Sequence, residues 1–206
     1  MNSKGYKEEL EKRILDIPEG TTFVASDFAD IAGSRTIREL FRRMVVNNTI
    51  LRVAPGIYMR PLFSTLLNEQ VPADPDDIAH SIARSNNWTI APSGNTALNN
   101  LGLSTQVPVV WSYVSDGPYS QKIVQGNTIS FKHTANRNIT GMSAVTLLVV
   151  QALKALGRER VDKTVLQAIS ERLSEEDLEA LIKETERSTV WIRDAIRSVA
   201  SLRSGS

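Results

Sequence analysis

Six arginines between residues 34 and 60 are the side chains best suited to bind an anionic partner: Arg35, Arg38, Arg42, Arg43, Arg52 and Arg60. Six arginines and one acid, Glu39, give this stretch a formal charge of +5, although the whole chain carries +1. A planar guanidinium can donate two parallel hydrogen bonds to a phosphate or a guanine. The stretch therefore predicts contact with nucleic acid, and a solvated helix face is the simpler alternative.

Two local patterns place these arginines on a helix and a hairpin. Apolar residues recur at the spacing of one helix face from residue 37 onward, and the nearby arginines fall largely off that face. Residues 50–53 and 57–58 flank a Pro55-Gly56 turn and indicate two short strands. A basic helix followed at once by a hairpin is typical of a recognition helix and its wing.

The preceding residues complete the order of a winged helix-turn-helix. Three segments are expected there: a helix over 4–17, an extended piece over 20–24, and a brief helix over 27–31. Phe23 and Val24 of the extended piece are available to pair with the wing. Gly33 supplies the turn, and Ser34 is expected to cap the basic helix. The apolar side chains should form the core: Phe28, Ile31, Ile37, Leu40, Phe41 and Met44. We therefore predict a winged helix-turn-helix over residues 1–60 that binds double-stranded operator DNA.

The polar residues of this domain have separate expected roles on DNA. Residues at the start of the recognition helix should reach base edges in the major groove and carry specificity: Ser34, Arg35, Thr36 and Arg38. Arg42 and Arg43 should meet phosphates, while Arg52 and Arg60 flank the wing. A symmetric operator would be bound by a homodimer, because half-site spacing mirrors protein symmetry.

The remainder of the chain has a different composition. One arginine and five acids between residues 61 and 120 give a formal charge of −4. Helical and extended patterns alternate up to about residue 140 and then become helical to the end. We expect an α+β fold class, with a mixed α+β domain over 61–157 and a helical extension over 158–206.

Groups suited to catalysis or metal binding are sparse, with two histidines and no cysteine. One polar segment is a candidate anion or partner site: Lys132, His133, Asn136 and Arg137. The alternative, which the composition favours, is a loop whose side chains bond their own backbone. Ser93 lacks the glycine two residues before it that a nucleophile elbow needs. Asp74, Asp76 and Asp77 lack the further oxygen ligands of a calcium loop. We expect no enzymatic activity, cofactor or metal.

The sequence also bears on location. It contains no apolar run of about 18 residues, the length of a membrane-spanning helix. The first residues, MNSKGYKEELEKR, lack the apolar core of a signal peptide. The absence of cysteine suits a reducing compartment. We expect a cytoplasmic protein with no membrane partner.

Several longer stretches resemble one known family. RVAPGIYMRP occupies residues 52–61, and IAPSGNTALNNLGLSTQVP occupies 90–108, followed by VVWSYVSDGPY and ISFKHTANRNITGMS. Together they resemble the AbiEi-like antitoxins of type IV abortive-infection toxin–antitoxin systems, including shorter relatives classed as transcriptional regulators. The resemblance covers residues 5–157 and is carried mainly by the second block. The chain departs from the longer antitoxins in its helical region beyond Gly157.

This resemblance implies a function for each part of the chain. The N-terminal winged helix would bind operator DNA and repress its own operon. The second domain would antagonise a nucleotidyltransferase-like toxin without forming a stable complex. Three alternatives stay open. One is a stand-alone winged-helix regulator without a toxin. Another is a protein-interaction module whose winged helix is a scaffold and whose helical C-terminal half binds another protein. The third is an enzyme acting on nucleic acid or nucleotides through His133, Asn136 and Arg137.

Overall fold

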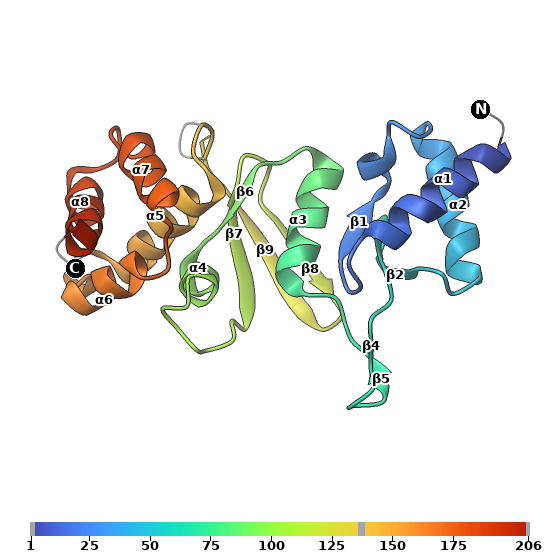
Figure 1. Ribbon diagram of the computed structural model, residues 1–206, viewed down its shortest axis with the longest axis horizontal. Helices are drawn as coiled ribbons and strands as arrows, with labels where there is room; N and C mark the ends of the chain where they lie inside the picture. The colour runs from blue at the N-terminus through green and yellow to red at the C-terminus, as the bar shows by residue number, and fades with distance from the viewer. Residues whose placement is uncertain (1–2, 136–138, 205–206) are drawn as a thin grey trace. The chain divides into compact units, whose positions relative to one another are not determined.

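The computed structural model describes residues 3–135 and 139–204, and it has the predicted α+β class. Its contacts divide the chain into two units. The first comprises residues 1–88 and 123–127, and the second comprises residues 89–122 and 128–206. Each unit has its own hydrophobic core, so each is described separately below (Figure 1).

The first unit begins with helices and strands in the expected order. They are α1 (Ser3–Asp16), β1 (Thr22–Val24), the 3-10 helix η1 (Ala25–Phe28), α2 (Ser34–Val46), β2 (Leu51–Ala54) and β3 (Ile57–Met59). The strands form one antiparallel sheet in the order β1-β3-β2. Phe23 lies opposite Tyr58, which confirms that the extended piece pairs with the hairpin. Gly56 closes the hairpin turn at a φ of +80°, a conformation that glycine adopts without steric cost.

The segment between β1 and α2 differs in two details from the sequence-based expectation. The brief helix is a single 3-10 turn over 25–28 instead of a helix over 27–31. The Asp27 carboxylate accepts a hydrogen bond from the Val24 N–H at 2.9 Å and so starts this turn. Gly33, not Ser34, is the N-cap residue of α2, and it has no side chain to satisfy the first helical N–H groups.

Aromatic rings join the elements of the first unit. The ring centroid of Phe41 on α2 lies 5.4 Å from Phe23, 5.7 Å from Phe28 and 4.7 Å from Tyr58. These rings come from β1, η1 and β3, and Phe41 is fully buried among them. The other predicted core residues belong to the same cluster, with Ile31 only partly buried. The predicted core is therefore confirmed.

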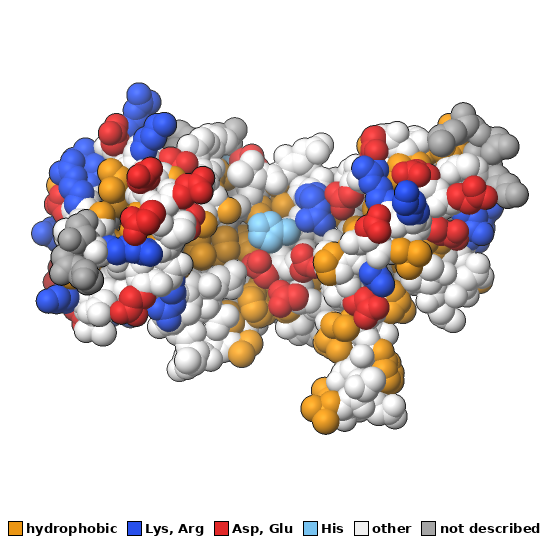
Figure 2. Space-filling view, viewed as in Figure 1, with side chains coloured by type: hydrophobic (Ala, Val, Ile, Leu, Met, Phe, Trp, Pro, Cys, Tyr) orange, Lys and Arg blue, Asp and Glu red, His pale blue; other side chains and the backbone are white. Residues whose placement is uncertain are grey.

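Two further elements extend the first unit beyond residue 60. A hairpin of β4 (Phe63–Ser64) and β5 (Glu69–Gln70) occupies the expected connector. Figure 2 shows apolar side chains on the surface of this hairpin. The exposed fraction is 53% for Phe63, 92% for Leu66 and 64% for Leu67. Helix α3 (Pro75–Asn86) follows and packs on β1, β3 and η1.

The placement of α3 changes the expected domain division. We expected residues 61–157 to form one domain, but the N-terminal part of that range clusters with the first unit up to Trp88. The reason is long-range packing of α3 on the three-stranded sheet, which local composition does not reveal.

The second unit holds a four-stranded sheet and most of the later helices. Its elements are β6 (Ile90–Pro92), α4 (Gly94–Asn100), β7 (Val110–Ser115), β8 (Ser120–Val124), β9 (Asn127–His133), α5 (Ala144–Leu156), η3 (Arg158–Arg160), α6 (Lys163–Ser170), α7 (Glu175–Glu184) and α8 (Val190–Ser204). The strand order is β6-β7-β9-β8, with β7 parallel to β9. The tip of the β8–β9 hairpin, residues 123–127, is grouped with the first unit.

The last helices do not form a separate extension over 158–206. Leu101 of the α4 end, Val149 of α5, Leu181 of α7 and Ile196 of α8 share one buried cluster. Ser174 and Asp177 form a reciprocal cap of α7, each side chain accepting from the other residue's N–H. In the described part of the chain, no helix is long and apolar enough to cross a membrane.

Replacing Phe41 with alanine should lower the free energy of unfolding by about 3–5 kcal/mol, because a ring contacted by three others leaves a cavity. Urea denaturation would measure the loss. Leu66→Ala is the control and should change stability little, since its side chain is 92% exposed. Equal stability of the parent and the Phe41 variant would contradict this description of the core.

Candidate nucleic-acid interface

The buried stripe of α2 fixes which of its side chains face outward. Ile37, Leu40, Phe41 and Met44 are buried in the core of the first unit. A helix with one buried stripe presents its other faces to solvent. The polar residues at its start are accordingly accessible: Ser34, Arg35 and Arg38 are exposed, and Thr36 is half-buried.

An open groove of about 560 Å³ runs beside the start of α2. It is lined by residues from α2, from the β2–β3 hairpin, from around η1 and from α3: Val24, Ala25, Ser26, Ala29, Ser34, Arg38, Arg52, Pro55, Gly56, Tyr58 and Ser85. The structure therefore brings together three residues predicted from the sequence as DNA contacts, Ser34, Arg38 and Arg52.

The exposed arginines of this surface differ in their ion pairing. Within residues 3–135 and 139–204, Arg35, Arg38 and Arg52 have no ion-pair partner. An arginine that is not already paired can form a charge-assisted hydrogen bond to a phosphate or base without first losing a carboxylate. These three are the guanidinium groups best placed to bind an external anion.

Arg42 and Arg43 are already paired with a carboxylate on the same helix. Arg42 donates two hydrogen bonds to Glu39, at 3.1 and 3.0 Å, and Arg43 donates one at 3.2 Å. Hydrogen bonding from Arg42 is the main cause that lowers the pKa of Glu39, and the hydrogen bond from Arg43 is the second. Glu39 in turn raises the pKa of Arg42. Both arginines stay exposed, but their charge is partly balanced.

Arg60, which directly follows β3 of the hairpin, bonds to the end of α1. One guanidinium nitrogen donates to the carbonyls of Leu15 and Ile17, each at 2.6 Å. The other terminal nitrogen pairs with Glu19 at 3.3 Å. Arg60 thus satisfies carbonyl groups at the end of α1, where a helix leaves its last acceptors unbonded. These contacts hold the half-buried Arg60 within the first unit.

The pKa of the Glu39 carboxyl should depend directly on its pairing with Arg42 and Arg43. Its folded-state pKa is lowered below the ordinary value of 4.5, so the pairing contributes to stability above that pH and is lost as the pH falls through the folded pKa. In a variant carrying Arg42→Ala and Arg43→Ala, the pKa of Glu39 should return toward 4.5. A pH titration followed by NMR of the side-chain carboxyl carbon would measure it.

The matched control is Lys7→Ala, which removes a cation that pairs with Glu11 on α1. This variant should leave the pKa of Glu39 unchanged. A Glu39 pKa that stays equally low after loss of both α2 arginines would contradict the assigned pairing.

The second candidate site is only partly described. Lys132 and His133 are exposed at the end of β9, and Nδ1 of His133 lies 2.9 Å from the Gly117 carbonyl oxygen. Asn136 and Arg137 lie outside the described residues. This contact joins His133 to a separate loop and does not decide between an anion site and a loop that bonds its own backbone.

Further polar residues lie at or within the helices α3 and α4. Asp74 caps α3 by accepting from the Asp76 N–H at 2.8 Å, and Asp77 accepts from the Thr22 N–H at 2.8 Å. Ser93 is the N-cap residue of α4, although its side chain makes no capping bond. Nε2 of His80 lies 3.6 Å from Oδ2 of Asp76, one turn earlier on α3. The described residues contain no cluster of three or more histidine or acidic side chains that could hold a metal ion.

The pairing of Glu39 and three of the residues that line the groove were not predicted from the sequence. The pairing of Glu39 has a clear local signal, because residues three and four apart meet on a helix surface. Ser26, Tyr58 and Ser85 line the groove through tertiary packing, and no local pattern marks them.

The chain belongs to a family of unknown function, DUF6088, whose family model matches residues 9–181. The match begins in α1 and ends in α7, so it includes most of both units. A comparison with curated proteins gave no match.

Proposed function

We propose that the first unit is a winged helix-turn-helix that binds double-stranded operator DNA, with α2 as the recognition helix and the β2–β3 hairpin as the wing. In this proposal, the chain is a transcriptional autoregulator that binds DNA and does not catalyse a reaction. Its place of action is the cytoplasm, and a homodimer would occupy a symmetric operator.

The observation that carries the proposal is the groove shared by Arg38 and Arg52. One arginine comes from α2 and the other from the hairpin, and neither has an ion-pair partner among the described residues. A recognition helix enters the major groove with its N-terminal residues near base edges. Arg38 would then contact bases, while Arg52 would contact the backbone beside them.

The antitoxin part of the proposal rests on the resemblance to the AbiEi-like family. We propose that the second unit antagonises a nucleotidyltransferase-like toxin of a type IV system and forms no stable complex with it. Coexpression of the chain with the product of a neighbouring gene of that type would test this. Relief of growth arrest by the chain would support the proposal, and persistent arrest would contradict it.

DNA binding would be tested by fluorescence anisotropy with the DNA upstream of the chain's own gene. Titrations at two salt concentrations, with unrelated DNA as competitor, separate specific from non-specific binding. Specific binding that weakens with salt would support the autoregulator. No binding even at low salt would reject the proposal.

Arg38→Ala should weaken binding to operator DNA by about tenfold or more, because a base-reading guanidinium discriminates by about 1–3 kcal/mol. Its effect on unrelated DNA should be smaller. Arg42→Ala should weaken both DNAs about equally and only slightly, since Glu39 already balances its charge. Anisotropy titrations of both variants would check this, and two variants that bind like the parent would remove the assignment of α2 as recognition helix.

Glu39→Gln should strengthen binding to unrelated DNA. The change removes a negative charge from α2 and releases Arg42 and Arg43. Each released cation that reaches a phosphate should steepen the slope of log affinity against log salt by about 0.9. Glu9→Gln makes the same charge change on the exposed surface of α1 and should have little effect. If the Glu39 and Glu9 variants show equal slopes of log affinity against log salt, Arg42 and Arg43 do not face phosphates.

A protein-interaction module is the second candidate, and the exposed apolar hairpin β4–β5 favours it. Phe63, Leu66 and Leu67 extend apolar surface into solvent without a covering element among the described residues. Exposed apolar patches often mark interaction sites. If the DNA titration fails, substitution of Leu66 and Leu67 by serine would test this hairpin by its effect on self-association in sedimentation.

A further inference from the structure

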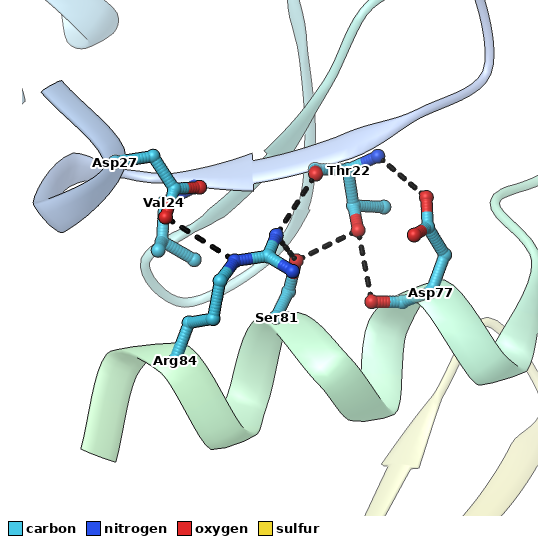
Figure 3. A network of polar contacts seen from close by, with 6 residues as sticks. All are labelled: Thr22, Val24, Asp27, Asp77, Ser81 and Arg84. Carbon is cyan, nitrogen blue, oxygen red and sulfur yellow. Dashed lines mark hydrogen bonds and ion pairs between the residues drawn. The ribbon is translucent and has the colours of Figure 1, made fainter. Parts of the chain in front are cut away.

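Arg84 of α3 hydrogen-bonds to two separate segments of the first unit (Figure 3). Its Nε donates to the Asp27 carboxylate of η1 at 3.2 Å, and its Nη2 donates to the Thr22 carbonyl of β1 at 3.1 Å. The same nitrogen donates to the hydroxyl of Ser81, one turn earlier on α3, at 2.8 Å. One guanidinium therefore links α3, β1 and η1.

Thr22 and Ser81 extend these contacts into the buried part of the unit. The Thr22 N–H donates to the Asp77 carboxylate at 2.8 Å, and its hydroxyl donates to the Asp77 carbonyl at 3.0 Å. The Thr22 and Ser81 hydroxyls lie 2.7 Å apart, and both residues are buried. Buried polar groups are costly unless they are hydrogen-bonded, so this network requires one relative position of α3 and β1.

The element held at the end of this network has little stability of its own. Helix η1 is one 3-10 turn, and such turns have poorer hydrogen-bond geometry than an α-helix. Phe28 anchors its apolar side against Phe23 and Phe41. Asp27 anchors its polar side, because the carboxylate accepts from both Arg84 and the Val24 N–H.

The position of η1 determines one wall of the groove. Ser26 and Ala29 line the groove together with Ser34 and Arg38 at the start of α2. A shift of η1 would change the shape of the groove and the turn that leads into α2, without altering any side chain of the interface.

We propose that Arg84 is a positioning residue for DNA binding, which it supports by holding η1 through Asp27. The inference rests on the proposed DNA-binding function. Arg84 supplies no contact to DNA; its role depends on the geometry of the guanidinium, which reaches Asp27, Thr22 and Ser81 at once. A lysine in its place keeps the charge but cannot reproduce this fork.

Two measurements on Arg84→Lys test the proposal. Hydrogen exchange without DNA should show amides 24–29 exchanging about tenfold faster than in the parent, while amides 51–54 of β2 stay unchanged. Anisotropy titration should show affinity for operator DNA reduced about fivefold, within the range by which residues outside a binding site alter it. The dependence of affinity on salt should keep its slope, because no phosphate contact is lost.

Three further measurements distinguish the positioning role of Arg84 from a general effect of the substitution and from a loss of folding. Arg187→Lys makes the same substitution at an exposed position of the second unit and should match the parent in both measurements. A double-mutant cycle with Asp27→Ala should show that Arg84→Lys adds little once Asp27 is gone. Thermal unfolding identifies a temperature at which every variant is folded.

Two results would overturn the positioning role of Arg84, and a third would reject DNA binding itself. An Arg84→Lys variant that matches the parent in exchange and affinity would overturn the proposal. So would an Arg84→Ala variant whose salt slope falls by about 0.9, because the side chain would then contact a phosphate. If the parent binds no DNA, the proposed function fails, and the exchange data alone decide whether Arg84 holds η1.

Discussion

The packing of Phe41 against three other aromatic rings is the contact on which the first unit depends. Helix α2 has 13 residues, a length at which an isolated helix is marginal in water, and η1 has only four. Their order must therefore come from tertiary packing. The buried stripe around Phe41 fixes the rotation of α2 about its own axis, and this rotation decides that Arg35 and Arg38 face solvent.

Local sequence patterns were sufficient to predict α2, the hairpin and their core. Apolar spacing from Ile37 to Met44 matches one helix face, and Pro55-Gly56 marks a turn that glycine permits at positive φ. The antiparallel partner of β3 was also predictable, because Phe23 and Val24 are the apolar extended residues available nearby. Helix α2 and the hairpin each depend on residues close together in the chain, whereas the pairing of Phe23 with Tyr58 was expected from the order of elements in a winged helix.

Contacts between distant residues could not be predicted in the same way. Arg60 bonds carbonyls of residues 15 and 17, and Arg84 bonds residues 22 and 27. An exposed basic residue and a structural one look alike in a sequence, since the difference lies in which acceptors the fold brings near. For the same reason, the boundary expected after residue 60 separates α3 from the sheet on which it packs.

These contacts change how the charge of the arginine-rich stretch is understood. The formal charge of +5 treats the six arginines as equivalent. In the structure, Arg60 is bound to α1, while Arg42 and Arg43 share the charge of Glu39. Arg35, Arg38 and Arg52 have no ion-pair partner among the described residues, and two of them line the groove. Under the proposed function, a few unpaired guanidinium groups would favour selection among sequences more than a larger diffuse charge, which attracts any polyanion.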